Sequence, residues 1–135
     1  MTVRPAAARD IPAVLALWDS ARSAHAVTAD TVERVVPLVE SGALLVADAD
    51  GDVIGAVIAA FDGWRGSFYR LAVAPAWRRR GVARRLVAAG EVRLRALGAP
   101  RVSALVAFDD EVARGFWRSV GFDADAVMGR MVRTL

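Results

Sequence analysis

The sequence contains no cysteine and only one histidine, and it also lacks lysine, asparagine and glutamine. Without cysteine the chain forms no disulfides, and a cytoplasmic location is the default expectation. No apolar stretch approaches the roughly 20 residues that span a bilayer, and the first residues lack the apolar segment of a signal peptide. These absences argue against a membrane protein and against a secreted one.

The residues that are present indicate a globular protein. The chain has 135 residues, of which 56% are hydrophobic, so a single domain over residues 1–135 is large enough to bury its own core. All 18 basic residues are arginine, which together with abundant alanine is typical of a GC-rich genome and lowers the weight of any single arginine. The net charge of +3 is too small to indicate nucleic-acid binding by itself.

Hydrophobic periodicity and turn residues predict alternating strands and helices. Strands are expected at residues 2–4, 44–47, 53–61, 68–73, 102–107 and 126–132, and helices at residues 10–24, 30–40, 82–97 and 111–120. Asp30 is the expected N-cap of the second helix, which Pro37 should bend. This order predicts an α/β (α+β) protein, with a mixed sheet covered by helices and one β-α-β crossover at its centre.

The segment from Leu71 to Ala83 has the clearest chemical meaning. An apolar strand ends before Pro75, and the arginines at residues 78–80 and Gly81 precede the third helix. A turn of this kind presents backbone N–H groups at the positive end of a helix dipole. It therefore predicts an anion site, and the arginines favour phosphate or pyrophosphate as the anion.

Two motifs resemble the GNAT superfamily of acetyl-CoA-dependent N-acetyltransferases. The first is Arg78-Arg79-Arg80-Gly81-Val82-Ala83, which follows the strand end Val73-Ala74-Pro75. The second runs from Asp110 to Phe122 and is similar to the family pattern Asn-x-x-Ala-x-x-Phe-Tyr-x-x-x-Gly-Phe. The turn at residues 62–66 and the tail at residues 128–132 resemble a small bacterial subgroup typified by YpeA.

The resemblance implies both a fold and an activity. The fold is a mostly antiparallel, twisted sheet of six to seven strands with helices on both faces. The activity is transfer of an acetyl group from acetyl-CoA to a primary amine by direct attack, without a covalent enzyme intermediate and without a metal. The absence of cysteine agrees with a mechanism that needs no protein nucleophile.

The resemblance also implies where acetyl-CoA binds. Its pyrophosphate is expected on the backbone amides of Arg78, Arg79, Arg80, Gly81, Val82 and Ala83. Its pantetheine arm is expected to lie along Leu71, Ala72 and Val73, in a gap where strand 68–73 splays from strand 102–107. The amide of Leu71 is the expected donor to the thioester carbonyl, where it would stabilise the oxyanion.

Two positions depart from the family pattern. Trp117 stands where a tyrosine usually protonates the leaving thiolate, and an indole N–H is no acid near neutral pH. A pure packing role for Trp117 is an equal alternative. Asp110 stands at the position of an asparagine beside the cofactor, and Arg114, one turn along, is expected to compensate its charge.

No residue of the sequence is identified as the general base. Ser67 stands where some family members carry glutamate, and it could hold a water in a proton relay. His25, in a loop expected to border the acceptor pocket, has a suitable pKa, although lone loop histidines are more often solvated. Tyr69 is expected to pack in the core, and Glu91 is expected to pair with Arg95 at i+4.

The hairpin turn at residues 62–66 is expected to approach the acceptor. Asp62 is explained by turn chemistry alone. Trp64 and Arg65 are less usual in a turn, so they are candidates for shaping a pocket for an acidic or aromatic amine.

Two other functions stay open. The first is a catalytically weakened acyl-CoA-binding regulator of the same fold, which Trp117 suggests. The second is a nucleic-acid binder, which is disfavoured because the four tryptophans fall on different elements. The sequence does not identify the acceptor amine. The oligomeric state is also open, although a C-terminal edge strand often supports a homodimer in such folds.

Overall fold

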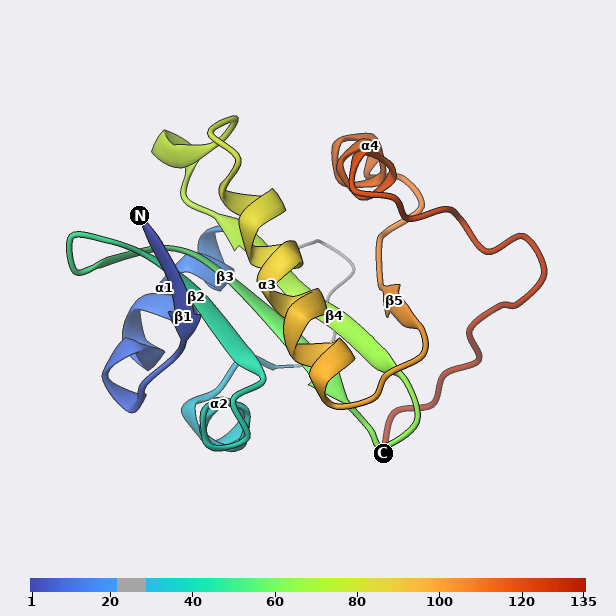
Figure 1. Cartoon of the computed structure of the whole chain (residues 1–135), viewed down its shortest axis with the longest axis horizontal. Coiled ribbons are helices and arrows are strands. Elements are labelled where there is room, and N and C mark those ends of the chain that lie inside the picture. Colours follow the sequence, from blue (N-terminus) through green and yellow to red (C-terminus); the bar gives the residue numbers. More distant parts are fainter. Residues whose placement is uncertain (22–28) are drawn as a thin grey trace. The chain divides into compact units, whose positions relative to one another are not determined.

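The computed structural model describes residues 1–21 and 29–135, which form two compact units, Met1–Leu105 and Val106–Leu135 (Figure 1). His25, the candidate at the acceptor pocket, lies outside the described residues. Among the described residues, no helix combines the length and the apolar character needed to cross a membrane.

The first unit is built on a mixed sheet of five strands in the order β1-β2-β3-β4-β5. These are β1 (Thr2–Pro5), β2 (Leu44–Ala49), β3 (Asp52–Phe61), β4 (Gly66–Val73) and β5 (Val102–Ala104). The pairs from β1 to β4 are antiparallel, whereas β4 and β5 are parallel. The parallel pair is connected through a helix, which confirms the predicted β-α-β crossover, but the crossover lies at the edge of the described sheet and not at its centre as predicted.

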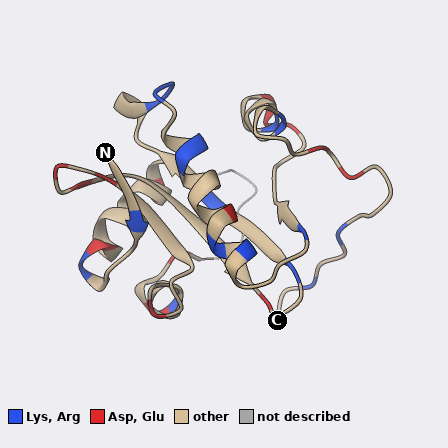
Figure 2. Cartoon of the chain, viewed as in Figure 1, with Lys and Arg blue, Asp and Glu red and all other residues tan. Residues whose placement is uncertain are grey.

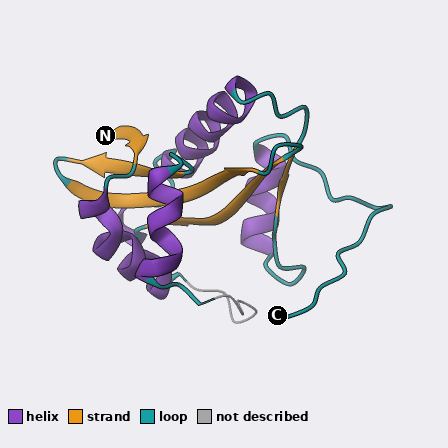
Figure 3. Ribbon diagram, turned by 90° about the horizontal axis from the view of Figure 1, so that it is seen from below, coloured by secondary structure: helices purple, strands orange, loops and turns teal. Residues whose placement is uncertain are grey.

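Helices cover both faces of this sheet, as Figure 3 shows. On one face lie α1 (Ile11–Ser20), which follows a 3-10 turn at Ala8–Asp10, and α2 (Val32–Glu40). On the other lies α3 (Val82–Ala96). Because apolar side chains of the strands alternate between the faces, the sheet contributes to a core on each side.

Gly90 lets α3 pack closely against the sheet. A Cβ at this position would overlap the ring of Phe68, a fully buried residue of β4, and would also crowd Ala59 of β3. The contact packs α3 against β4 at Phe68, the third residue of that strand. The turn at residues 75–81 links the C-terminal end of β4 to the start of α3.

The second unit contains one helix among its residues, α4 (Glu111–Ser119). The carboxylate of Asp110 accepts a hydrogen bond from the Ala113 amide at 3.0 Å and so caps the helix. The buried Trp117 ring makes edge-to-face contacts with Phe116 and Phe122, with centroid distances of 5.4 and 4.9 Å.

The predicted strand at residues 126–132 is wrong, and so is the expectation of six to seven strands, since the sheet of the described residues has five. Asp125 supplies the physical reason. Its carboxylate accepts hydrogen bonds from the amides of Val127 and Met128, both at 3.0 Å, and this bends the backbone where a ladder would have to start. The strand predicted at residues 102–107 ends at Ala104.

Three further sequence predictions are corrected. The first helix ends at Ser20, not at residue 24. Thr31, rather than Asp30, caps α2, because the Thr31 hydroxyl accepts from the Arg34 amide while the Asp30 carboxylate pairs with Arg70. Tyr69 does not pack in the core, since it lies on β4 with 39% of its surface exposed.

Candidate functional site

Strand β4 is longer than its pairing with β5. The parallel ladder joins Gly66, Ser67 and Phe68 to Val102, Ser103 and Ala104, and it ends there within the described residues. β4 itself continues to Val73 and stays paired on its other side with β3. The β4–β5 ladder thus covers only the first part of β4, whereas the divergence of the two strands and an extended ligand lying along residues 69–73 stay predictions.

A β-bulge interrupts β4 in this same half. Ala56 pairs with Ala72 and Ile58 pairs with Tyr69, so Val57 of β3 faces both Arg70 and Leu71. Arg70 has a φ of 55°, in the left-handed region that non-glycine residues rarely adopt. A bulge breaks the ladder locally and turns backbone groups away from the neighbouring strand. The predicted oxyanion donor, the Leu71 amide, lies within this bulge.

The turn after β4 has the geometry of an anion site. Following a 3-10 turn at Pro75–Trp77, Arg79 and Gly81 both have positive φ, of 62° and 79°. Gly81 is the N-cap residue of α3, no side chain caps the helix, and the first intrahelical bond runs from Arg85 to Gly81. The amides of Val82 and Ala83 therefore have no acceptor inside the helix.

Positive charge surrounds these amides. Figure 2 shows basic residues on the turn and along α3. The side chains of Arg78, Arg79 and Arg80 are exposed, and the Arg80 guanidinium stacks on the Trp77 ring at 5.0 Å from its centroid. A Cβ at Gly81 would meet no atom within 4 Å, so the space above the turn is open. Guanidinium groups beside uncapped helix amides can hold a phosphate or pyrophosphate.

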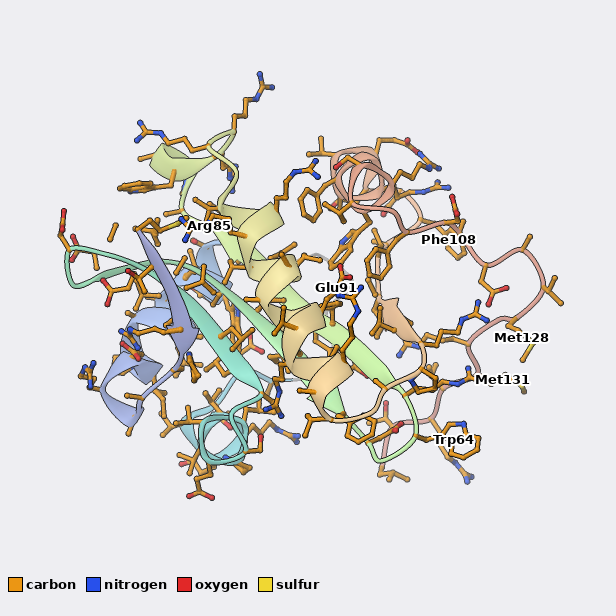
Figure 4. All side chains as sticks on the ribbon, in the orientation of Figure 1. Trp64, Arg85, Glu91, Phe108, Met128 and Met131 are labelled. Atoms are coloured by element: carbon orange, nitrogen blue, oxygen red, sulfur yellow. The ribbon has the colours of Figure 1, made fainter. Side chains whose placement is uncertain are left out.

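The β3–β4 hairpin turn uses Asp62 for its own structure. The Asp62 carboxylate accepts hydrogen bonds from the Trp64 and Arg65 amides at 2.7 and 2.8 Å. These bonds, that from Arg65 first, hold the pKa of the Asp62 carboxyl below its usual range. Trp64 is 74% exposed and projects from the turn (Figure 4). Turn chemistry thus accounts for Asp62, whereas nothing in the fold requires Trp64.

The second unit holds the two residues that depart from the family pattern. Asp110 is explained as the cap of α4. Arg114 does not pair with it as predicted, but bonds to Glu111 at 3.4 Å and to the Phe108 carbonyl at 3.0 Å.

The expected pair of Glu91 and Arg95 on α3 is present, at 3.3 Å. In the parts of the chain that are described, no cluster of three potential metal-ligating side chains occurs.

Sequence reasoning located the strand end and the turn, but it missed the bulge. The structure brings Leu71, Ala72 and Val73 together with the turn at residues 78–83 in one unit, and Ser67 lies four residues before Leu71 on the same strand. In a sequence, glycine or asparagine usually indicates a residue with left-handed backbone conformation. An arginine at position 70 gives no such signal.

Comparison with known proteins agrees with this geometry. A family model described as the acetyltransferase (GNAT) family matches residues 14–122. The aminoglycoside 6'-N-acetyltransferase AAC(6')-IG of Acinetobacter haemolyticus superposes with a TM-score of 0.77 and 21% identity, over 100% of this chain and 99% of that one. Ard1 from Thermoplasma volcanium gives a TM-score of 0.81 and 22% identity, over 93% and 84%.

A third similar structure contains a ligand. It is AAC(6')-Iy in complex with a bisubstrate analogue, CoA-S-monomethyl-acetylneamine, with a TM-score of 0.78 and 19% identity over 98% of each chain. At these identities the likeness is one of fold.

Proposed function

The chain belongs to the acetyltransferase (GNAT) family, which classes it as an acyltransferase, and from this premise we propose that it transfers an acetyl group from acetyl-CoA to a primary amine. The amine nitrogen attacks the thioester carbonyl carbon, the C–N bond forms, and the C–S bond breaks to release the CoA thiolate. The proton lost by the attacking nitrogen goes to solvent or to a bound water. No covalent bond to the enzyme is required.

The residues of the turn fit the phosphates of acetyl-CoA. The Val82 and Ala83 amides have no intrahelical acceptor, the three exposed arginines supply positive charge, and Gly81 leaves the approach open. Gly81 has a left-handed φ, and this backbone conformation orients the amides of the turn. A residue with a Cβ would adopt the same conformation only at a cost of about 1–2 kcal/mol. The similar AAC(6')-Iy structure, which holds a CoA-based analogue, supports the same choice of ligand.

One observation carries the proposal: the pairing of β4 with β5 ends at Phe68, while β4 continues to Val73 and leads into the Gly81 turn. A pantetheine arm lying beside Leu71, Ala72 and Val73 would join the acyl group to the phosphate site. The acyl carbonyl would then lie at the bulge, where the Leu71 amide can stabilise the oxyanion.

The proposed chemistry uses no strong protein acid. Trp117 packs against Phe116 and Phe122, and these contacts support its role as a packing residue. A thiolate with a pKa near 8 to 9 can leave as the anion and be protonated by water, so transfer stays feasible without a phenol. Ser67, on the strand next to the bulge, could hold a water that accepts the amine proton.

The acceptor end is proposed to be bordered by Trp64 and Arg65 and by the segment that contains His25.

Cytoplasmic location, assembly as a homodimer and the YpeA-like subgroup stay predictions from the sequence. The packing of Trp117 also favours a second candidate function, an acyl-CoA-binding regulator that binds the same ligand and transfers nothing.

The test is a calorimetric titration with acetyl-CoA of the wild type, Gly81→Asp and Gly98→Asp. Gly98 is a matched control, because it ends α3 as Gly81 begins it, has a positive φ of 92°, and would place its Cβ in open space. We expect micromolar binding to the wild type and to Gly98→Asp. Gly81→Asp should bind on the order of 100-fold more weakly, since it puts a negative charge and a Cβ beside amides that hydrogen-bond an anion.

Release of free thiol with a series of amines then separates the two functions. Turnover with at least one amine, such as an aminoglycoside, an amino acid or a peptide N-terminus, supports the enzyme. Binding without turnover across the series supports the regulator. Absence of binding to the wild type contradicts both.

A further inference from the structure

The bulge in β4 holds an arginine in a conformation that costs free energy. Arg70 has a φ of 55°, and a left-handed residue with a Cβ costs about 1–2 kcal/mol relative to a right-handed one. Glycine would occupy this conformation without the penalty. The structure around Arg70 must therefore hold it in this conformation.

Asp30 is a partner that contributes to holding Arg70. Its carboxylate Oδ1 lies 3.0 Å from Nη2 of Arg70, and the two side chains are only 14% and 22% exposed. A partly buried ion pair is screened less by salt than a surface pair. Asp30 belongs to the segment immediately before α2, so the ion pair joins this segment to the bulge.

The position of Arg70 gives the ion pair a consequence for the chemistry. Arg70 and Leu71 together face Val57, so the dihedral angles of Arg70 set the direction of the next amide, that of Leu71. We propose that Asp30 is a positioning residue: through Arg70 it holds the bulge in the geometry in which the Leu71 N–H points at the acyl carbonyl. This inference rests on the proposed function and assigns a role to a pair that the sequence did not reveal.

Two substitutions at position 70 separate strain from charge. Arg70→Ala and Arg70→Gly both remove the guanidinium and the ion pair, but only glycine accepts the left-handed φ without penalty. We expect Arg70→Gly to keep kcat within about threefold of the wild type. Arg70→Ala should lower kcat about tenfold, a fraction of the loss that follows complete removal of an oxyanion donor. The KM for acetyl-CoA should change by less than about threefold in both variants, because the turn at residues 78–83, proposed to bind the phosphates, is unchanged.

A double-mutant test separates positioning from simple tethering. Asp30→Asn should lower kcat about tenfold on its own and have no further effect in the Arg70→Gly background, where no strain needs to be offset. If Asp30 merely anchored the segment before α2 through the ion pair, Arg70→Gly, which also removes the pair, would lower kcat as much as Asp30→Asn does. Equal kcat values for Arg70→Ala and Arg70→Gly would likewise overturn the proposal. Circular dichroism and thermal unfolding confirm that each variant is folded.

A second measurement does not depend on activity. Amide hydrogen exchange of Tyr69 and Ala72, whose pairs with β3 flank the bulge, should be faster by NMR in Asp30→Asn and Arg70→Ala than in Arg70→Gly and the wild type, because the bulge opens more readily. If the wild type fails to bind acetyl-CoA, the proposed function is wrong, and the exchange rates alone decide whether Asp30 holds the bulge. Identical exchange rates in all four proteins overturn it.

Discussion

Three non-glycine residues of the described chain have positive φ: Asp50, Arg70 and Arg79. Asp50 is explained by the β2–β3 hairpin, where it precedes Gly51 in a two-residue turn that requires positive φ at both positions. Arg70 and Arg79 instead lie in the bulge and in the turn at residues 75–81. Backbone strain of this kind persists where the surroundings hold it, and it clusters at functional sites. Its presence at these two positions therefore supports the same site that the strand pairing indicates.

A different residue, Asp10, should be important for stability rather than for function. Its carboxylate accepts from Arg4 Nη1 at 2.8 Å and from the Ala7 amide at 2.7 Å, and it is 6% exposed. We expect Asp10→Asn to lower the free energy of unfolding by about 2 kcal/mol, since hydrogen bonds to charged groups contribute about 1.5–3 kcal/mol. Urea unfolding at pH 7 measures this. Asp19→Asn, an exposed site on the same unit, should change it by less than about 0.5 kcal/mol.

The same network predicts how stability depends on pH. Hydrogen bonds from Arg4 hold the pKa of Asp10 below its usual range, and they do the same for Asp48. A carboxyl whose pKa is lower in the folded state stabilises the fold fully above its unfolded pKa, near 4, and this contribution is lost as pH falls through the folded value. The difference in unfolding free energy between the wild type and Asp10→Asn should therefore shrink as the pH is lowered from 5 to about 2. A difference that grows on acidification would contradict the assignment.

At the scale of an element, two helical glycines should respond to the same substitution with opposite signs. In α3, a Cβ at Gly90 would overlap the Phe68 ring, so Gly90→Ala should destabilise the protein by about 1–3 kcal/mol. In α4, a Cβ at Gly115 would meet nothing within 4 Å, so Gly115→Ala should stabilise its helix by up to about 1 kcal/mol. Thermal unfolding followed by circular dichroism compares them. A stabilised Gly90→Ala variant would show that α3 does not pack as described.

The elements also show how far the sequence could lead. Long segments such as α3 and β3 were predicted within one residue at each end, because α3 has one buried face and β3, buried on both faces, is a continuous apolar run between turns. Predictions failed where a side chain found a partner distant in sequence or bonded to nearby backbone. Asp30 has the residue type and position of a helix cap, but its carboxylate pairs with Arg70, 40 residues away in the sequence. Asp125 bends the backbone of residues 125–128, where the apolar residues that follow had predicted a strand.

The candidate site divides in the same way. The turn at residues 78–83 follows from a local signal, glycine and arginine between a strand and a helix, and so it was predictable. The bulge depends on the register between β3 and β4, in which Arg70 and Leu71 of β4 both face Val57 of β3. No local sequence pattern predicts this extra residue. The positions of Asp110 and Trp117 in the reaction stay predictions from the resemblance alone.

At the scale of the whole molecule, the absence of lysine and cysteine removes the usual sites of self-acetylation. The chain carries 18 arginines, whose guanidinium groups stay protonated at any physiological pH and do not attack a thioester. The α-amino group is then the one ordinary amine nucleophile that the chain itself offers. Thiol released in the absence of an added amine must therefore come from hydrolysis or from that single group, which makes the amine screen unusually simple to interpret.

This composition also tests direct attack against a covalent intermediate. We expect intact-mass spectrometry of the protein, mixed with acetyl-CoA and quenched during turnover, to show at most one acetyl group, located on the α-amino group. Without cysteine or lysine, a covalent intermediate would have to be an ester of serine, threonine or tyrosine, an acylated histidine or a mixed anhydride, and these survive only if the quench is rapid and acidic. Arg9→Lys, which places one exposed amine on the surface, serves as the control for slow non-enzymatic acetylation. An additional acetyl group on a hydroxyl or imidazole that forms and disappears at the rate of turnover would show that the amine does not attack acetyl-CoA directly.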